Sequence, residues 1–268
     1  MVIRKQNILI RRGKLSGRHS LGYWRKSALL LMLVLLGGCG RSDQISEKAE
    51  IAADSLQVMV ETKIAHKKAL QDFRHSELPP DFQAKVENYY PVIRKYSSRY
   101  GFDWRLIVLQ ILKESAFREN ARSQVGAMGL MQIMPATATE IRREMDIEYI
   151  AINPSENIAG GIYHLYKQLR YFPQAQGNDR LKLALAAYNA GPARVIDAQK
   201  IARFKNLDPQ SWEAVKSCLP LLTPDSWRLH LDVWELGVPA YGYFYGFRET
   251  ISYVDEIFRN YQLLTKSF

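Results

Sequence analysis

Apolar residues recur at spacings of three and four along most of the chain beyond Asp81, a pattern typical of amphipathic helices. The first such stretch runs to Gly101, with Asp81 expected to cap its start and Gly101 its end. Pro91 lies inside this stretch and is expected to kink or split the helix. The next stretch, Trp104–Phe117, is opened by Asp103 and is apolar over most of its surface, so it is predicted to be a buried core helix. The same spacing predicts further helices at residues 136–145, 157–172, 180–189, 193–203 and 248–264.

Strand signals are sparse in this part of the chain, because sustained alternation of apolar and polar positions and Asn-Gly hairpin turns are both missing. Helical patterns joined by short connections predict an all-α globular domain over residues 81–268. Residues 192–248 carry a weaker pattern, and we expect them to be helical padding that walls a groove.

Residues 43–77 are highly charged and also predict a helix. Its apolar positions follow alternating spacings of four and three, but the series includes Lys63 and His66. A solvated amphipathic spacer is therefore favoured over a coiled coil. Leu78-Pro79-Pro80 ends this helix and marks a domain boundary, which makes residues 39–80 a helical spacer or tether.

The N-terminal residues 1–38 have the features of a secretory signal peptide. Ala28–Gly38 is an apolar run that follows Arg25-Lys26 and is too short to span a membrane. The run ends in Leu36-Gly37-Gly38-Cys39, which resembles a bacterial lipobox. That resemblance implies cleavage before Cys39, lipidation of its thiol and, with Gly40 following, an outer-membrane address. The alternative is an ordinary secretory signal with a chance cysteine.

Charge and composition narrow the function classes. The chain has 37 Lys and Arg against 27 Asp and Glu, a net charge of +10, but residues 1–38 hold eight of the basic residues and none of the acidic ones. The rest of the chain is nearly neutral, which argues against a nucleic acid as partner. Cys218 is the only thiol besides Cys39 and is expected to be buried and inert. The histidines are scattered, so no metal site and no cofactor are predicted.

Glu114 is the polar exception on the predicted core helix. It lies seven residues after Ile107 and three after Ile111, so the helical period places it on their apolar face. Loss of hydration favours the neutral carboxyl group and raises its pKa, which suits a general acid near neutral pH. Alternatively, Glu114 emerges at the helix end and meets Lys113 or Arg118 in water.

Six segments around and after Glu114 resemble the lytic transglycosylases, and more specifically their lysozyme-like catalytic module, the SLT domain of family 1. The segments are Glu114–Phe117, Ala121–Ser123, Gly126–Pro135, Asn157–Gly161, Ala186–Gly191 and Glu249–Val254. The resemblance implies a lysozyme-like, goose-type fold. Pro209–Lys216 and Leu219–Leu222 further resemble the catalytic module of membrane-bound lytic transglycosylase F. That family has an additional solute-binding-type domain, for which residues 40–80 are too few.

The resemblance implies that Glu114 is the catalytic residue and that seven others bind substrate: Ser115, Ser123, Met131, Gln132, Tyr188, Asn189 and Glu249. The hydroxyl of Tyr188 is expected to face the catalytic carboxyl group. Met131 and Tyr188 would more often be core residues, and Glu249 would serve equally as a capping carboxylate at the start of the last helix. The aromatic run Tyr241–Tyr245 could line a glycan groove, although helix packing is the more common role of such a run.

The implied reaction needs a single carboxyl group, in contrast to the pair used by ordinary glycosidases. Glu114 protonates the glycosidic oxygen between MurNAc and GlcNAc and then removes the proton from the C6 hydroxyl, which closes a 1,6-anhydro ring. The expected partner is peptidoglycan, and the expected location is the periplasmic face of the outer membrane. A lysozyme-type hydrolase and a catalytically silent wall-binding lipoprotein are the alternatives.

Overall fold

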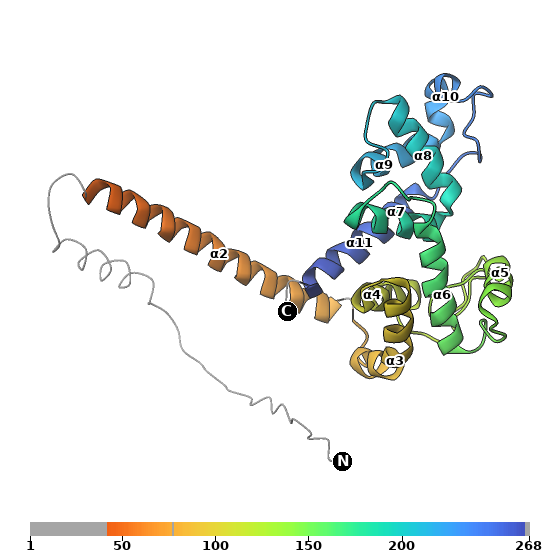
Figure 1. The fold of residues 1–268 in the computed structure, drawn as a ribbon, viewed down its shortest axis with the longest axis horizontal. Coiled ribbons are helices and arrows are strands. Elements are labelled where there is room, and N and C mark those ends of the chain that lie inside the picture. The colour runs from red at the N-terminus through yellow and green to blue at the C-terminus, as the bar shows by residue number, and fades with distance from the viewer. Residues whose placement is uncertain (1–41, 77, 266–268) are drawn as a thin grey trace, which may run out of the picture. The chain divides into compact units, whose positions relative to one another are not determined.

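The computed structural model describes the backbone of residues 42–76 and 78–265 and the side chains of residues 51–76 and 78–265 (Figure 1). The predicted signal peptide, residues 1–38, and the predicted lipidation site, Cys39, lie outside the described residues. Among those described, none of the helices combines the length and apolarity needed to cross a membrane.

Helix α2, Ser42–Ser76, corresponds to the helix predicted at residues 43–77. Two structural units divide within it, between Lys63 and Ile64. Side chains 51–65 of α2 are all exposed, in keeping with a solvated helix. The existence of the helix is confirmed, and its role as a spacer stays a prediction.

The unit that begins at Ile64 is built from helices alone. After the last turns of α2 they are α3 (Phe82–Tyr100), α4 (Trp104–Ser115), α5 (Pro135–Met145), α6 (Pro154–Leu169), α7 (Gly177–Ala190), α8 (Pro192–Phe204), α9 (Trp212–Cys218), the 3₁₀ helices η1 (Leu219–Leu222) and η2 (Pro224–Ser226), α10 (Trp227–Val233) and α11 (Phe247–Thr265). Residues 42–76 and 78–265 contain no β-strand, only isolated bridges from Met128 to Arg122 and Ile133. The all-α prediction is confirmed.

Helix ends agree with the sequence at two of three predicted caps. Gly101 ends α3 in the left-handed conformation (φ 76°), and the Asp103 carboxylate accepts a hydrogen bond from the Arg105 amide at 2.9 Å to start α4. The cap predicted at Asp81 is wrong. Its backbone (φ −100°, ψ 16°) is not in the extended conformation of a capping residue, and its carboxylate pairs with Lys85 at 3.1 Å.

Pro91 does not split α3, so that half of the expectation is wrong, and the kink stays a prediction. Tyr89 and Ile93, on either side of the proline, are both buried and hold the two halves of the helix against the core. Pro91 itself is exposed, so its ring faces solvent.

The core of this unit forms around α4, whose residues from Leu106 to Ile111 are all buried. Helix α11 packs against both α4 and α7, and α6 packs against α3, α5 and α7. Figure 1 shows α8, α9 and α10 on one side of α7 and α11, with α3, α4 and α5 on the other. Cys218 is buried and free, as predicted. The segment that follows α8 is helical in part, as expected, and ends in an irregular stretch, residues 234–246, before α11.

Candidate active site

Glu114 lies in the last turn of α4, at the end of the buried apolar run. The helix stops abruptly behind it, because Ala116 and Phe117 both adopt positive φ angles, 51° and 59°. Positive φ strains residues with a β-carbon, and such strain is retained where packing enforces it. Phe117 supplies that packing, since it is buried and its ring meets the ring of Phe82 edge-on at 5.6 Å.

The environment of Glu114 raises the pKa of its carboxyl group to about 7, chiefly through burial. The hydroxyl of Tyr253 donates a hydrogen bond to Glu114 Oε1 at 2.6 Å and partly offsets this rise, whereas the negative charge of Glu249 adds to it. The raised pKa expected from the apolar helix face is therefore confirmed. The alternative of a solvent ion pair is wrong, because Lys113 pairs with Glu256 and Arg118 Nε donates to the Ser115 carbonyl at 3.0 Å.

Tyr253 is the functional residue that sequence reasoning missed. It is buried on α11, and Gln110 Nε2 donates to its oxygen at 3.2 Å while its own hydroxyl donates to Glu114. Burial and the Glu114 charge hold the pKa of Tyr253 well above its ordinary value, so it stays a proton donor in this bond. Tyr253 lies in the segment Glu249–Val254, which resembles the family, but only Glu249 of that segment was predicted to bind substrate.

The loop that follows, residues 116–134, is held by hydrogen bonds between side chains and backbone. Ser123 Oγ accepts from the Ala127 amide at 2.9 Å and closes a turn. Gln132, at φ 45°, donates from Nε2 to the carbonyls of Gly129 at 2.9 Å and Ala121 at 3.2 Å. Ser123 and Gln132 are both half-buried, so each has a structural role and a partly accessible surface.

Two other predicted substrate-binding residues are buried, one just before this loop and one within it. Ser115 is buried, and its hydroxyl lies 2.9 Å from the Leu130 carbonyl. Met131 is fully buried, which agrees with the core role considered for it. Ser115 thus holds the loop through the Leu130 carbonyl, and neither side chain offers an exposed surface to a ligand in this structure.

Asn157, at the start of α6, fastens the loop to the core. Its Oδ1 accepts from the Met131 amide at 2.8 Å, and its Nδ2 donates to the carbonyls of Met128 at 3.1 Å and Ile150 at 3.0 Å. Sequence reasoning recorded Asn157 within a motif without assigning it a role. A buried amide in an otherwise apolar run was the available signal.

Close packing explains why glycine occupies two positions, 129 and 161, in the segments that resemble the family. A β-carbon on Gly161 would lie 2.6 Å from Cβ of Met131, and one on Gly129 would lie 2.5 Å from Cγ of Asn157. Gly129 also has φ 80°, which only glycine adopts without strain. The loop and α6 therefore approach each other more closely than any larger residue allows.

The C-terminal end of α7 contributes Tyr188 and Asn189. The hydroxyl of Tyr188 donates to the Met131 carbonyl at 2.7 Å, whereas the bond to Glu114 comes from Tyr253. Burial and the charge of Glu114 raise the pKa of Tyr188 well above its ordinary value. Asn189 Oδ1 accepts from Thr250 Oγ1 at 2.7 Å and so joins α7 to the first turn of α11.

Two further ionisable groups, Glu249 and His164, interact with Glu114 and Tyr188. Glu249 is exposed in the first turn of α11, where it suits the N-terminal end of the helix and also acts electrostatically on Glu114. The ring of His164 lies 5.0 Å from that of Tyr188, and burial lowers the pKa of His164 to about 4. The imidazole is therefore neutral where Glu114 titrates. Within the described ranges, no three His, Cys, Asp or Glu side chains gather as metal ligands.

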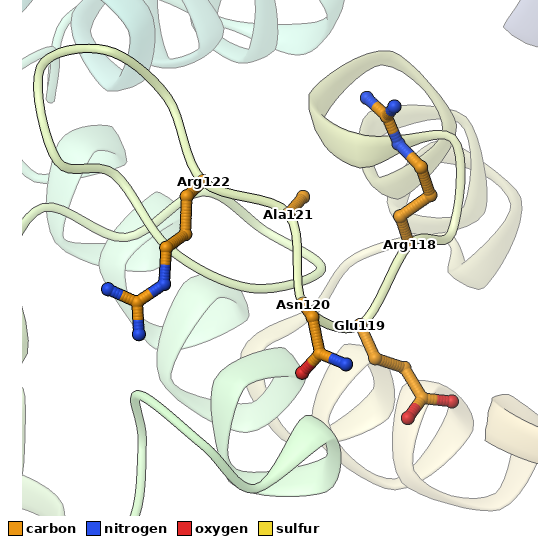
Figure 2. Close-up of a pocket in the computed structure, with 5 residues that line it drawn as sticks. All are labelled: Arg118, Glu119, Asn120, Ala121 and Arg122. Atoms are coloured by element: carbon orange, nitrogen blue, oxygen red, sulfur yellow. The ribbon is translucent and has the colours of Figure 1, made fainter.

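An open hollow of about 410 Å³ borders the strained turn after Glu114 and is lined by residues 118–122. Figure 2 shows that the guanidinium groups of Arg118 and Arg122 point away from each other, with Glu119 pointing in a third direction. These side chains do not converge on one ligand.

Comparison with known proteins identifies the domain. Residues 91–210 match the family model of the Transglycosylase SLT domain, a span that includes Glu114, Asn157 and Tyr188. The chain contains an SLT domain. The resemblance drawn from the six segments is thereby confirmed.

Curated relatives extend the match beyond the SLT domain. Membrane-bound lytic murein transglycosylase F of Desulfosudis oleivorans is 34% identical over 183 residues, which cover 67% of this chain and 37% of the relative. The protein of the same name from Shewanella pealeana is 34% identical over 181 residues, covering 67% and 34%. The chain thus spans little more than a third of the length of these relatives.

Solved structures are matched over a similar stretch. An inactive mutant of lytic transglycosylase Slt from Pseudomonas aeruginosa aligns with 29% identity over 62% of this chain and 22% of that one, with a TM-score of 0.39. The 70 kDa soluble lytic transglycosylase from Escherichia coli aligns with 25% identity over 63% and 22%, also with a TM-score of 0.39.

Proposed function

We propose that this protein is a peptidoglycan lytic transglycosylase, which cleaves the β-1,4 bond between MurNAc and GlcNAc and leaves a 1,6-anhydroMurNAc end. The observation that carries the proposal is the carboxyl group of Glu114, whose pKa is raised to about 7 within an SLT domain. A group that titrates near neutral pH can donate and recover a proton within one catalytic cycle.

In the first step, neutral Glu114 donates its proton to the glycosidic oxygen, and the bond from that oxygen to C1 of MurNAc breaks. Tyr253 donates to Oε1 of Glu114, so the carboxylate that forms keeps one hydrogen bond. The acetamido group of the same MurNAc stabilises the positive charge at C1. GlcNAc leaves with a hydroxyl at C4.

In the second step, the Glu114 carboxylate takes the proton from the C6 hydroxyl of MurNAc. The C6 oxygen forms a bond to C1, which closes the 1,6-anhydro ring and returns Glu114 to its neutral state. Water is neither consumed nor released, and the same carboxyl group serves as acid and then as base.

We further propose roles for the remaining predicted residues according to where they lie. Gln132, Ser123, Asn189 and Glu249 contact the hydroxyl and acetamido groups of the bound glycan, since each is at least partly accessible. Ser115 and Tyr188 act on substrate through the loop 116–134, which they support, and Met131 acts within that loop through the carbonyl that binds Tyr188.

A second candidate function is a two-carboxylate hydrolase of the lysozyme type. The observation that favours it is the electrostatic effect of Glu249 on Glu114, because ordinary glycosidases pair two carboxyl groups. The two candidates differ in product: a hydrolase leaves a reducing end, which is one water heavier than the anhydro end.

The test is mass spectrometry of fragments released from purified sacculi. We expect the unaltered chain to release anhydro ends, and Glu114→Gln to lower the rate at least about 10³-fold because no proton donor is left. Glu148→Gln, a change at an exposed glutamate outside the site, should keep the original rate. Release of reducing ends alone would favour the hydrolase, and wall binding without any release would establish a silent binding protein.

We also propose that Cys39 is lipidated and that the enzyme works from the periplasmic face of the outer membrane. The lipobox-like sequence and the membrane-bound relatives support this assignment. Cys39→Ala should move the protein from the membrane fraction of cells to the soluble periplasmic fraction, as measured by immunoblotting. Retention of that variant in the outer membrane would contradict lipidation as the anchor.

A further inference from the structure

Residues 239–246, here called the aromatic loop, connect α10 to α11 and have no part in the mechanism above. Two of its rings are turned to solvent: Tyr241 is 56% exposed and Tyr245 is 70% exposed. Exposed aromatic rings of this size are a common means of binding ligands with both apolar and polar parts.

The aromatic loop borders the candidate active site. Its last residue, Gly246, has its carbonyl 3.2 Å from Thr250 Oγ1, and this hydroxyl donates to Asn189 at 2.7 Å. Asn189 follows Tyr188, whose hydroxyl donates to the Met131 carbonyl in the loop 116–134 at 2.7 Å. Tyr245 is therefore one residue away from a hydrogen-bond network that extends to the site.

Two side chains from one turn of α8 hold the backbone of the aromatic loop. Arg194 Nη1 donates to the carbonyls of Tyr241 and Gly242, and the buried carboxylate of Asp197 accepts from the Tyr241 amide at 3.1 Å. The guanidinium of Arg194 also lies 6.0 Å from the ring centre of Phe244. These contacts fix the backbone and leave both tyrosine rings pointing outward.

The conformation of the loop is also set locally. Gly242, at φ 83°, closes a turn in which its amide donates to the Pro239 carbonyl at 2.9 Å. The Phe244 amide donates to the Leu222 carbonyl at 3.0 Å, which ties the middle of the loop to η1. A loop anchored at both its turn and its middle presents its rings with little conformational freedom to lose on binding.

Saccharides are the ligands that this arrangement suits. A pyranose ring offers a face of C–H groups to an aromatic ring and hydroxyls to the phenol oxygen, and a tyrosine has only two side-chain torsions to fix on binding. The nearby Arg194 donates to two carbonyls of the loop, so its guanidinium is engaged by the backbone.

We propose that Tyr241 and Tyr245 form an extension of the glycan-binding site, which stacks on sugar units of the strand beyond the cleaved bond. This inference rests on the proposed function, since it takes the glycan strand as the ligand. It predicts a dependence on strand length, because the sugar units proposed to stack on the two rings lie beyond those at the cleaved bond.

The test is binding to the full chain carrying Glu114→Gln, which prevents turnover. The probes are peptide-free glycan strands prepared from sacculi and a tetrasaccharide of alternating GlcNAc and MurNAc, with affinity measured by calorimetry. We expect Tyr241→Ala/Tyr245→Ala to weaken strand binding about tenfold and to leave tetrasaccharide binding within about twofold. Replacement of Tyr245 by tryptophan should restore most of the loss due to Tyr245→Ala, because stacking is retained.

Tyr171→Ala is the matched control. Tyr171 is 51% exposed and lies six residues before the start of α7, whereas Tyr188 lies eleven residues after that start, about 16 Å along the helix at 1.5 Å per residue. This variant should bind strands as the parent does. Equal strand affinity of the double variant and its parent would overturn the inference, as would an equal loss for strand and tetrasaccharide. Neither outcome depends on whether the active enzyme releases anhydro ends. Failure of the proposed function would appear in the mass spectrometry of released fragments and not in these binding measurements.

Discussion

Two sides of the candidate active site are built in opposite ways. On the inner side, formed by the end of α4, the loop 116–134 and the start of α6, polar side chains are engaged by the protein itself. Asn157 alone makes three hydrogen bonds to three parts of the backbone. On the outer side, formed by the aromatic loop and the first turn of α11, Tyr241, Tyr245 and Glu249 face solvent.

The difference follows from what each side has to do. A carboxyl group keeps a pKa near 7 only where its surroundings are dry and fixed, since water or a mobile dipole would restore its ordinary value. A polymeric substrate needs accessible groups along its length. The inner side therefore accounts for most of the raised pKa of Glu114, and the outer side leaves its side chains accessible.

Replacing a glycine on each side by alanine should give the largest difference between the two sides, measured as the loss in free energy of unfolding. Gly161→Ala places a β-carbon 2.6 Å from Cβ of Met131, an atom too close to its backbone to move aside. We expect a loss of about 2–3 kcal/mol in the free energy of unfolding, measured by urea denaturation. Activity should fall as well, because displacement of Met131 moves the carbonyl that binds Tyr188.

Gly242→Ala in the aromatic loop is the matched change on the outer side. The nearest atom to its β-carbon would be Arg194 Nη1 at 3.8 Å, so the cost comes only from the positive φ of 83°. We expect about 1 kcal/mol or less and no change in the pH dependence of activity. Equal destabilisation by Gly161→Ala and Gly242→Ala would show that the inner side is no more tightly built than the outer one.

Local sequence patterns were enough to predict most of the helices and the acid. The periodicity of α4 placed Glu114 on an apolar face, and Gly101 and Asp103 marked helix ends through their own backbone preferences. The preferences of Asp81 and Pro91 gave wrong predictions of a cap and of a split helix. The Asp81 carboxylate pairs with Lys85 and does not cap the helix, and buried residues on both sides of Pro91 keep the helix continuous.

The partners of Glu114 could not be predicted in the same way. Tyr253 lies 139 residues from Glu114 in sequence, and no periodicity within α11 shows which helix its hydroxyl meets. The role of Asn157 likewise depends on where the loop 116–134 folds back onto α6. Ser115 and Tyr188 were assigned to substrate by resemblance, whereas their hydroxyls meet the carbonyls of Leu130 and Met131.

The pH dependence of kcat/KM tests the inner side more finely. Glu114 must begin protonated, so activity should fall as pH rises through about 7. The Tyr253 hydroxyl stabilises the carboxylate, and its removal in Tyr253→Phe raises the pKa of Glu114 further. The alkaline limb of the profile should therefore move up by about one pH unit. An unmoved limb would mean that Tyr253 does not govern the acid.

Glu249→Gln should shift the same limb in the opposite direction and by less. The negative charge of Glu249 raises the pKa of Glu114, so its removal lowers that pKa and moves the limb toward acid, by about a few tenths of a pH unit because the side chain is exposed. High salt should move the limb of the unaltered enzyme in the same direction and affect this variant less, since it screens an exposed charge. Complete loss of activity in Glu249→Gln, with the limb unmoved in whatever remains, would instead make Glu249 the second carboxylate of a hydrolase and place essential chemistry on the outer side.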